Sequence, residues 1–237
     1  MKRVLQIIHS EVADISVISK FFQKKHHTST IFYKNLRFLK KNELDQFDLF
    51  IFHGGKQSAN SKSKAIAYEY IFLKYIIKLN KPIIGICLGA QLIAKIYGSK
   101  ISKSKNKVFE CGYKKNLKNN NKFFKKNLFF LQFHTEGISF NKNMELLAKG
   151  ILYDVDSFKI KNKNIYGFQF HPEVTAQTIK RWHDIVKIKY PYIDNLNKIM
   201  KDFKKYQFQN YNWFQEFLLK LLKLSLIHIS EPTRRSV

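Results

Sequence analysis

The chain has 237 residues and a formal net charge of +26 at pH 7, from 43 Lys and Arg against 17 Asp and Glu. Hydrophobic residues make up 45% of it, enough to bury a sizeable core in one large or two small domains. Its two cysteines have no repeated spacing, which argues against a disulfide-built secreted domain and for a reducing compartment. The N-terminal apolar stretch is too short for a signal peptide, so we expect a cytoplasmic protein.

The strong positive charge raises the question of a nucleic-acid partner. The lysines are spread along the chain among Asn, Ile and Phe, without an RNP-type aromatic motif, a zinc finger or a recognition-helix pattern. We therefore favour a solvated basic surface over a nucleic-acid role, and a loop or hairpin tip for the basic segment 114–126. No spacing of potential ligands builds a metal site, and we expect no cofactor.

Taken in chain order, the sequence alternates between predicted strands and helices. Strands are predicted at 4–8, 29–33, 49–52 and 82–86. Helices are predicted at 15–24 and 64–79. Further strands are expected at 108–113, 128–133, 149–157 and 165–170, before a helix over 176–188 that Thr175 caps. This alternation predicts an α/β fold with a parallel sheet covered on both faces and ligands at the carboxyl ends of its strands.

Two segments follow this alternating pattern. Residues 194–224 are helix-like, and Lys220 and Lys223 interrupt their apolar group, so we expect a helix packed on the domain and no membrane span. Residues 225–235 resemble translated sequencing-adapter sequence. We therefore divide the chain into a domain at 1–190, a helical extension at 191–224 and a non-native tail at 225–237. We expect the tail to be disordered or loosely packed.

A G-x-C-x-G motif around Cys87 directly follows the predicted strand 82–86 and precedes a helix-like segment. This is the pattern of a nucleophile elbow, a sharp turn that holds a reactive side chain above a sheet. Gly85 and Gly89 keep Cβ atoms away from the strained turn. The start of the helix directs its N–H groups at the sulfur and favours the thiolate. A buried structural cysteine is the alternative interpretation.

A second motif, His-Pro-Glu, follows the strand predicted at 165–170. A thiol nucleophile needs a base for its proton, and that base needs a group that fixes its tautomer. His171 and Glu173 are two residues apart, so on an extended chain they point the same way. Pro172 between them stiffens the turn. An ordinary turn at a strand end is the alternative, but the two motifs together favour a catalytic pair.

These two motifs, GICLGAQ and FQFHPEV, resemble those of the class I glutamine amidotransferases, the glutaminases with a Cys-His-Glu triad. The chain looks most like the stand-alone proteins related to the glutaminase part of GMP synthase. The similarity runs from about Val4 to Lys189. It includes Gly54-Gly55 after an apolar strand, although Lys56 stands where the family usually has proline. It also includes an H-x-E turn at 134–136 where the family often has H-x-D.

The resemblance implies a three-layer α/β/α, flavodoxin-like fold and a role for each matching residue. Cys87 would be the nucleophile, His171 the general base and acid, and Glu173 the carboxylate that orients it. The backbone N–H groups of Gly55 and Leu88 would hold the oxyanion. Gln91 and Gly54 would contact bound glutamine.

Three classes of function stay open from the sequence. The first is a glutaminase that releases ammonia for an acceptor on a synthetase partner, through a thioester on Cys87. The second is a hydrolase of another γ-glutamyl compound or small amide with the same triad, and the third is a basic binding protein without catalysis. The intact triad argues against the third, and Gln91 favours the first over the second. The chain carries no G-G-x-D-S-type ATP-pyrophosphatase loop, so either an acceptor is reached on another subunit or the protein is a free-standing glutaminase.

Overall fold

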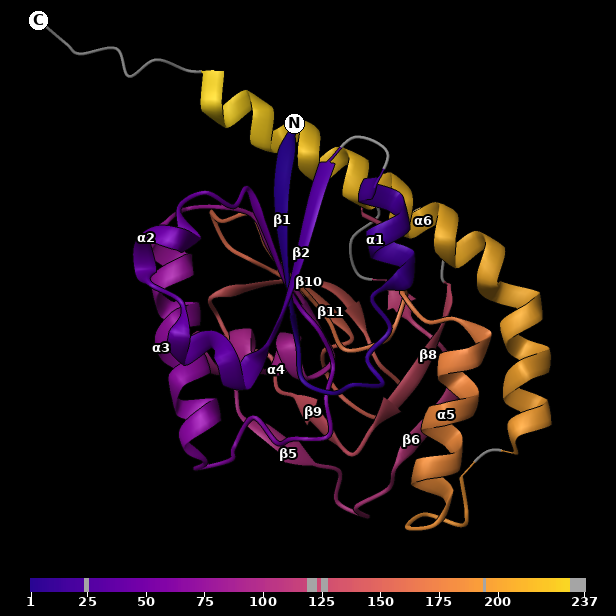
Figure 1. Ribbon diagram of the computed structural model, residues 1–237. Helices are drawn as coiled ribbons and strands as arrows, with labels where there is room; N and C mark the ends of the chain where they lie inside the picture. Colours follow the sequence, from indigo (N-terminus) through magenta and orange to yellow (C-terminus); the bar gives the residue numbers. More distant parts are fainter. Residues whose placement is uncertain (24–25, 119–122, 125–127, 194, 231–237) are drawn as a thin grey trace, which may run out of the picture.

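The strands and helices of the computed structural model are arranged around a central sheet (Figure 1). The structure describes residues 1–23, 26–118, 123–124, 128–193 and 195–230. In these residues, an eight-stranded sheet has the order β2-β1-β3-β4-β12-β11-β10-β7. Its strands are β1 (Lys2–Ile8), β2 (His26–Phe32), β3 (Leu49–Phe52), β4 (Ile83–Ile86), β7 (Leu117–Lys118), β10 (Met144–Lys149), β11 (Ser157–Ile160) and β12 (Ile165–Phe168). The strands from β2 to β12 pair in parallel and the last three pair antiparallel, which confirms a mainly parallel sheet.

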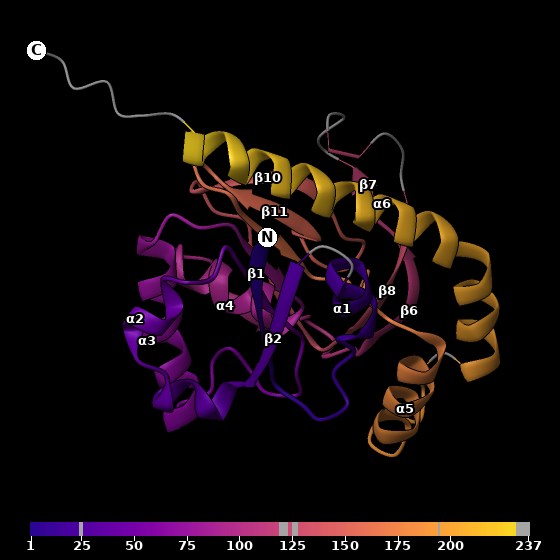
Figure 2. The same cartoon turned by 45° about the horizontal axis from the view of Figure 1, so that its top comes forward.

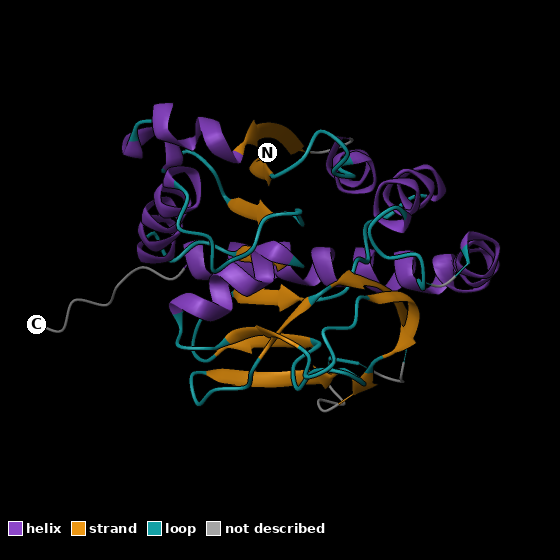
Figure 3. Cartoon of the chain, turned by 90° about the horizontal axis from the view of Figure 1, so that it is seen from below, coloured by secondary structure: helices purple, strands orange, loops and turns teal. Residues whose placement is uncertain are grey.

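Helices cover both faces of this sheet, which Figure 3 shows from below. One face carries η1 (Tyr33–Phe38), α2 (Lys41–Leu44), α3 (Lys64–Lys78) and α4 (Leu88–Ile96), and the other carries α1 (Ser16–Gln23) and α6 (Leu196–Ser230). Successive residues of a strand point to opposite faces. Phe50 and Phe52 of β3 therefore pack with the first group of helices, and Leu49 and Ile51 with the second. The predicted three-layer fold is confirmed.

Two short strand pairs lie outside the central sheet. They are β5 (Ile101–Lys103) with β9 (Glu136–Ile138), and β6 (Glu110–Lys115) with β8 (Phe129–His134). The β6–β8 pair packs against α5 (Ala176–Lys187) and the start of α6 in a cluster of its own. Cys111 of β6 is buried in this cluster, as a small apolar side chain would be.

The strand predicted at 149–157 is wrong. Lys149 ends β10, and the chain turns before Ser157 begins the antiparallel strand β11. The Gly150 N–H donates to the Tyr153 carbonyl, and a Cβ at Gly150 would lie only 3.0 Å from that oxygen. The apolar residues of this segment therefore belong to a tight turn that favours glycine, and not to an extended chain.

The long helix α6 runs across one face of the molecule (Figures 1 and 2). Phe214, Phe217, Leu218 and Leu221 are buried in the same cluster as the strands of that face. Among the described residues, no helix is long and apolar enough to cross a membrane. The backbone of α6 continues through Ser230, into the segment predicted to be a non-native tail, and 231–237 lie outside the described residues. Part of the basic segment 114–126 lies outside them as well.

Candidate active site

The turn at Cys87 joins β4 to α4 and has the shape of the predicted elbow. Cys87 has a φ of 50° and a ψ of −106°, a strained conformation for a residue with a side chain. Its N–H donates to the Phe168 carbonyl of β12 at 2.7 Å. A Cβ at Gly89 would lie 2.1 Å from the carbonyl oxygen of Phe52, and one at Gly85 would lie 2.6 Å from the backbone of Gly89. Both glycines are therefore required by close approaches of the backbone.

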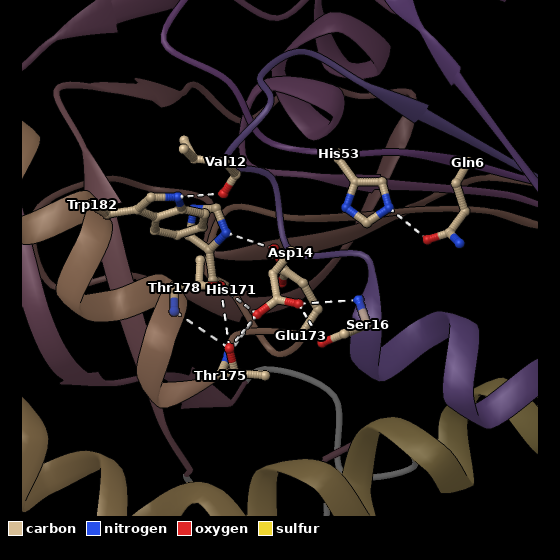
Figure 4. A network of polar contacts seen from close by, with 10 residues as sticks. All are labelled: Gln6, Val12, Asp14, Ser16, His53, His171, Glu173, Thr175, Thr178 and Trp182. Carbon is tan, nitrogen blue, oxygen red and sulfur yellow. Dashed lines mark hydrogen bonds and ion pairs between the residues drawn. The ribbon is translucent and has the colours of Figure 1, made fainter.

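The His-Pro-Glu turn brings an imidazole and a carboxylate together, as Figure 4 shows. His171 Nδ1 lies 2.9 Å from Glu173 Oε1, and both side chains are buried. The backbone N–H of His171 donates to the Leu131 carbonyl of β8 at 3.0 Å, which attaches the turn to a strand outside the central sheet. Because Nδ1 faces the carboxylate, the other ring nitrogen is left for chemistry in the cavity.

The charge state of His171 follows from its two neighbours. Burial alone would lower the pKa of this imidazole, but the charges of Glu173 and then Cys87 outweigh burial and raise it to about 10. A Cβ added to Gly54 would lie 2.8 Å from His171 Cε1 and 3.3 Å from Cys87 Cβ. The loop after β3 therefore passes directly beside both side chains.

The Gly54-Gly55 loop rests on the segment that follows β1. A Cβ at Gly55 would lie 2.4 Å from His9 Cβ. Gln57 Nε2 donates to the His9 carbonyl and to the Tyr33 hydroxyl, both at 3.2 Å. His9 Nε2 in turn lies 2.7 Å from Glu69 Oε1, with both side chains fully buried. The loop that lacks the usual proline is thus packed against a buried polar pair.

Gln91 lies on α4, one turn after Cys87. Its Nε2 donates to the Glu136 carbonyl at 2.8 Å and to Gln169 Oε1 at 3.2 Å. Its carbonyl oxygen is the group that it can offer to a substrate, as a hydrogen-bond acceptor.

The H-x-E segment lies at the wall of the same cavity, where His134, Thr135 and Glu136 line it. His134 Nε2 contacts Gln132 Oε1 at 2.9 Å and Glu110 Oε2 at 3.4 Å. Burial lowers the pKa of His134 to about 3 and raises that of Glu110 to about 7, so the imidazole stays neutral. This histidine is therefore held in a buried hydrogen-bond network.

These residues surround one cavity of about 950 Å³. Its lining includes five of the seven residues predicted for the site: Gly54, Gly55, Cys87, Gln91 and His171. The other two lie behind the wall, because Glu173 bonds to the far side of the His171 ring and the Leu88 side chain is buried in the core. Among the described residues, no group of three or more His, Cys, Asp or Glu side chains could hold a metal ion.

Sequence reasoning missed several residues around this cavity. Trp182 of α5 lines it, with its ring centroid 4.7 Å from that of His171, and Trp182 Nε1 donates to the Val12 carbonyl (Figure 4). Asp14 and the His9–Glu69 pair are buried next to it. None belongs to the motifs around Cys87 and His171. Apart from the contact of Asp14 with Ser16, their partners are far away in the sequence, so no short-range pattern could have indicated these contacts.

The fold and the site define an α/β protein with a cysteine at a nucleophile elbow and a His-Glu pair beside it. The sequence model of the family "Glutamine amidotransferase class-I" matches residues 4–182. The chain therefore belongs to the class I glutamine amidotransferase family.

Named relatives agree with this family. The chain is 40% identical over 105 residues to a glutamine-hydrolyzing GMP synthase subunit of Methanobrevibacter smithii, covering 43% of this chain and 55% of that protein. It is 30% identical over 166 residues to a glutamine amidotransferase-like protein of Acanthamoeba polyphaga mimivirus, and the match covers 66% of this chain and 73% of that protein. A crystal structure of a glutamine amidotransferase from Thermotoga maritima superposes with a TM-score of 0.82 at 25% identity. The superposition covers 93% of this chain and 97% of that one. The chain spans about half the length of the GMP synthase protein that it matches.

Proposed function

We propose that this protein hydrolyses the side-chain amide of glutamine, with Cys87 as nucleophile, and releases glutamate and ammonia. The observation that carries the proposal is the meeting of Cys87, His171 and the Gly54-Gly55 loop at one cavity, with Glu173 2.9 Å behind the imidazole. The imidazolium that Glu173 stabilises keeps a proton available beside the sulfur.

The first half of the reaction forms a thioester. The Cys87 sulfur attacks the amide carbon, a C–S bond forms, and the carbonyl electron pair moves to the oxygen. The N–H groups of Gly55 and Leu88 hold this oxyanion. His171 gives its proton to the amide nitrogen, the C–N bond breaks, and ammonia leaves.

The second half of the reaction restores the enzyme. Water adds to the thioester carbon and gives a proton to the now neutral His171. The C–S bond then breaks, the thiolate and imidazolium are regenerated, and glutamate leaves. Gln91 accepts a hydrogen bond from the α-ammonium group of glutamine, and the backbone at Gly54 leaves room for the substrate amide.

The relatives suggest where the ammonia goes. The matching protein of Methanobrevibacter smithii is by its name one subunit of a glutamine-hydrolyzing GMP synthase. We propose by analogy that this chain, with residues 1–190 as the glutaminase domain, delivers ammonia to a synthetase partner. Residues 191–224 then serve as an extension of that domain.

The size of the cavity favours a second candidate substrate. A volume of about 950 Å³ is near the upper end of the ~300–1,000 Å³ typical of ligand pockets. It exceeds what glutamine alone needs, so a larger γ-glutamyl amide is the alternative, cleaved by the same steps.

One assay tests both candidates: glutamate release from glutamine and from γ-glutamyl amides by the purified protein. We expect Cys87→Ala to lower the rate by at least about 10³-fold and to leave the circular dichroism spectrum unchanged. Cys111→Ala is the matched control, since Cys111 is also buried but lies on β6 outside the cavity lining. Full activity of Cys87→Ala would refute the assignment. Faster turnover of a larger amide than of glutamine would favour the second candidate.

A further inference from the structure

Asp14, in the segment between β1 and α1, accepts hydrogen bonds from the adjacent start of α1 and from a distant part of the chain. Its Oδ1 accepts from the N–H and hydroxyl of Ser16, at 3.1 and 2.6 Å. Its Oδ2 accepts from the N–H and hydroxyl of Thr175, at 2.9 and 2.7 Å, and from the Thr178 hydroxyl at 2.6 Å. Burial would raise the pKa of this carboxyl, but the hydrogen bonds outweigh burial and lower it, so Asp14 stays ionised at neutral pH.

The second of these parts of the chain is the turn that carries the His-Glu pair. Thr175 is two residues after Glu173 and is the N-cap of α5. Figure 4 shows the Asp14 carboxylate between Ser16 and Thr175, next to Glu173 and His171. Asp14 therefore fixes the backbone where it leaves the catalytic turn.

Glu173 depends on its backbone for its position. Its Oε1 contacts His171, whereas its buried Oε2 has no hydrogen-bond partner among the described residues. A carboxylate with one side-chain contact is oriented mainly by the chain that carries it. A shift of the backbone at Thr175 would thus move the carboxylate relative to the imidazole.

Asp14 itself stays away from the substrate. Residues 9–13 line the cavity, but Asp14 is not among the lining residues. The same segment is attached to α5 a second time, where Trp182 Nε1 donates to the Val12 carbonyl at 2.9 Å. The segment after β1 thus connects the cavity wall to the helix that follows the His-Pro-Glu turn.

We propose that Asp14 is a positioning residue for the His171–Glu173 pair, which it holds in place through Thr175 and Thr178 at the start of α5. The proposal rests on the catalytic role given to that pair above. Asp14 takes no part in binding glutamine, so its loss should lower kcat and leave KM unchanged.

The test compares Asp14→Asn with the wild type and with Asp48→Asn. Asparagine has the shape of aspartate but only one acceptor oxygen, so one of the two donor groups loses its partner. We expect kcat for glutamine to fall about 10- to 100-fold, because displacements near 1 Å can cost 10² in rate. KM should stay within about 3-fold, since an interaction outside the substrate site does not change ground-state binding. The pKa of His171, followed by NMR, should fall as its carboxylate moves away.

Asp48 is the matched control. Its carboxylate accepts hydrogen bonds from the Arg3 N–H at 2.9 Å and from Lys2 Nζ at 3.0 Å, at the opposite end of β1. Asp48→Asn should lower stability without changing kcat or the pKa of His171. Equal effects of both substitutions on kcat would overturn the proposal. So would an unchanged pKa of His171 in a folded Asp14→Asn protein.

Two further variants decide the matter if Asp14→Asn does not fold. Thr175→Ser keeps both donors to Asp14 and should retain kcat, whereas Thr175→Val loses the hydroxyl and should lower kcat with KM unchanged. Equal kcat values in the two variants would count against the proposal. The NMR titration of His171 needs no substrate, so it tests the positioning role even if the wild type does not hydrolyse glutamine.

Discussion

The two halves of the candidate active site are held in place by different means. The elbow at Cys87 is fixed by close approaches of backbone at Gly85 and Gly89, within a single strand–turn–helix segment packed on β3. The turn at His171 and Glu173 is fixed by hydrogen bonds that it donates to distant segments, to the Leu131 carbonyl and to the Asp14 carboxylate. The elbow depends mainly on steric exclusion, with one backbone hydrogen bond from Cys87 to Phe168 of β12. The turn depends mainly on polar contacts that can be weakened one at a time.

This difference predicts different responses to mutation. A side chain added at a close backbone approach cannot be accommodated without moving β3 or α4, so the elbow should fail as a unit. Loss of one hydrogen bond at the turn leaves the others in place, so activity should fall in steps. Substitutions in the elbow and in the turn can therefore show whether the two are held by different interactions.

The largest effect is expected at Gly89. A Cβ there would lie 2.1 Å from the Phe52 carbonyl oxygen, so Gly89→Ala must displace strand or helix. We expect a loss of about 3 kcal/mol or more in the free energy of unfolding, at the upper end for overpacking, and no measurable glutamine hydrolysis. Urea denaturation and the glutamate assay check this.

Gly98, at the other end of α4, is the control for the elbow. It has a φ of +100° but no atom within 4 Å of an added Cβ, so Gly98→Ala introduces backbone strain without a clash. We expect the free energy of unfolding to fall by about 1–2 kcal/mol and glutamine hydrolysis to stay nearly complete. If Gly89→Ala were no worse than Gly98→Ala, the steric account of the elbow would be wrong.

An intermediate effect is expected at Glu173. In Glu173→Gln the neutral amide no longer stabilises the imidazolium, so kcat should fall by about 10²- to 10⁴-fold. The Glu173 charge is the largest of the influences that raise the pKa of His171 to about 10. Its removal leaves burial, which lowers that pKa, opposed only by Cys87, so NMR should find His171 titrating below the wild-type value.

The same carboxylate makes stability depend on pH. The pKa of His171 is raised from 6.5 to about 10, so its contribution is complete below pH 6.5 and is lost as the pH rises through 10. A Cys87→Ala background removes the sulfur that also raises this pKa, so there the free energy of unfolding should begin to fall near pH 6.5 and the fall should end below pH 10, by at most about 1.4 kcal/mol per pH unit. Adding Glu173→Gln should flatten this fall. An identical pH dependence with and without Glu173 would show that the pair is not an ion pair.

The comparison also explains what the sequence could predict. The elbow and the His-Pro-Glu turn are local motifs, because Gly85 and Gly89 flank Cys87 and Glu173 is two positions after His171. Apolar runs and helical spacing likewise predicted β1, β2, β3, β4 and β12 of the sheet, but not β7, β10 and β11. The strand expected at 149–157 failed because an apolar run with Gly150 also suits a turn.

The contacts that support the turn could not be predicted in this way. Asp14 meets Thr175 across 161 residues, and Trp182 meets Val12 across 170. Neither aspartate nor tryptophan has a pattern of neighbours that indicates such a partner. The segment after β1 and the start of α5 follow the carboxyl ends of two parallel strands, β1 and β12, and only the three-dimensional structure shows that they meet there.

The smallest effect is expected at Trp182. Trp182→Phe keeps a ring near His171 and removes only the hydrogen bond from Nε1 to the Val12 carbonyl. Such a bond contributes about 1 kcal/mol to stability, and Asp14 still attaches the same segment to α5, so kcat should change by less than about 3-fold. Trp182→Ala is the harsher comparison, because it also removes the ring that packs 4.7 Å from the imidazole. A loss of kcat in Trp182→Phe as large as that in Asp14→Asn would contradict this. It would mean that the attachment of residues 9–13 to α5 orients His171, and not the backbone at Thr175.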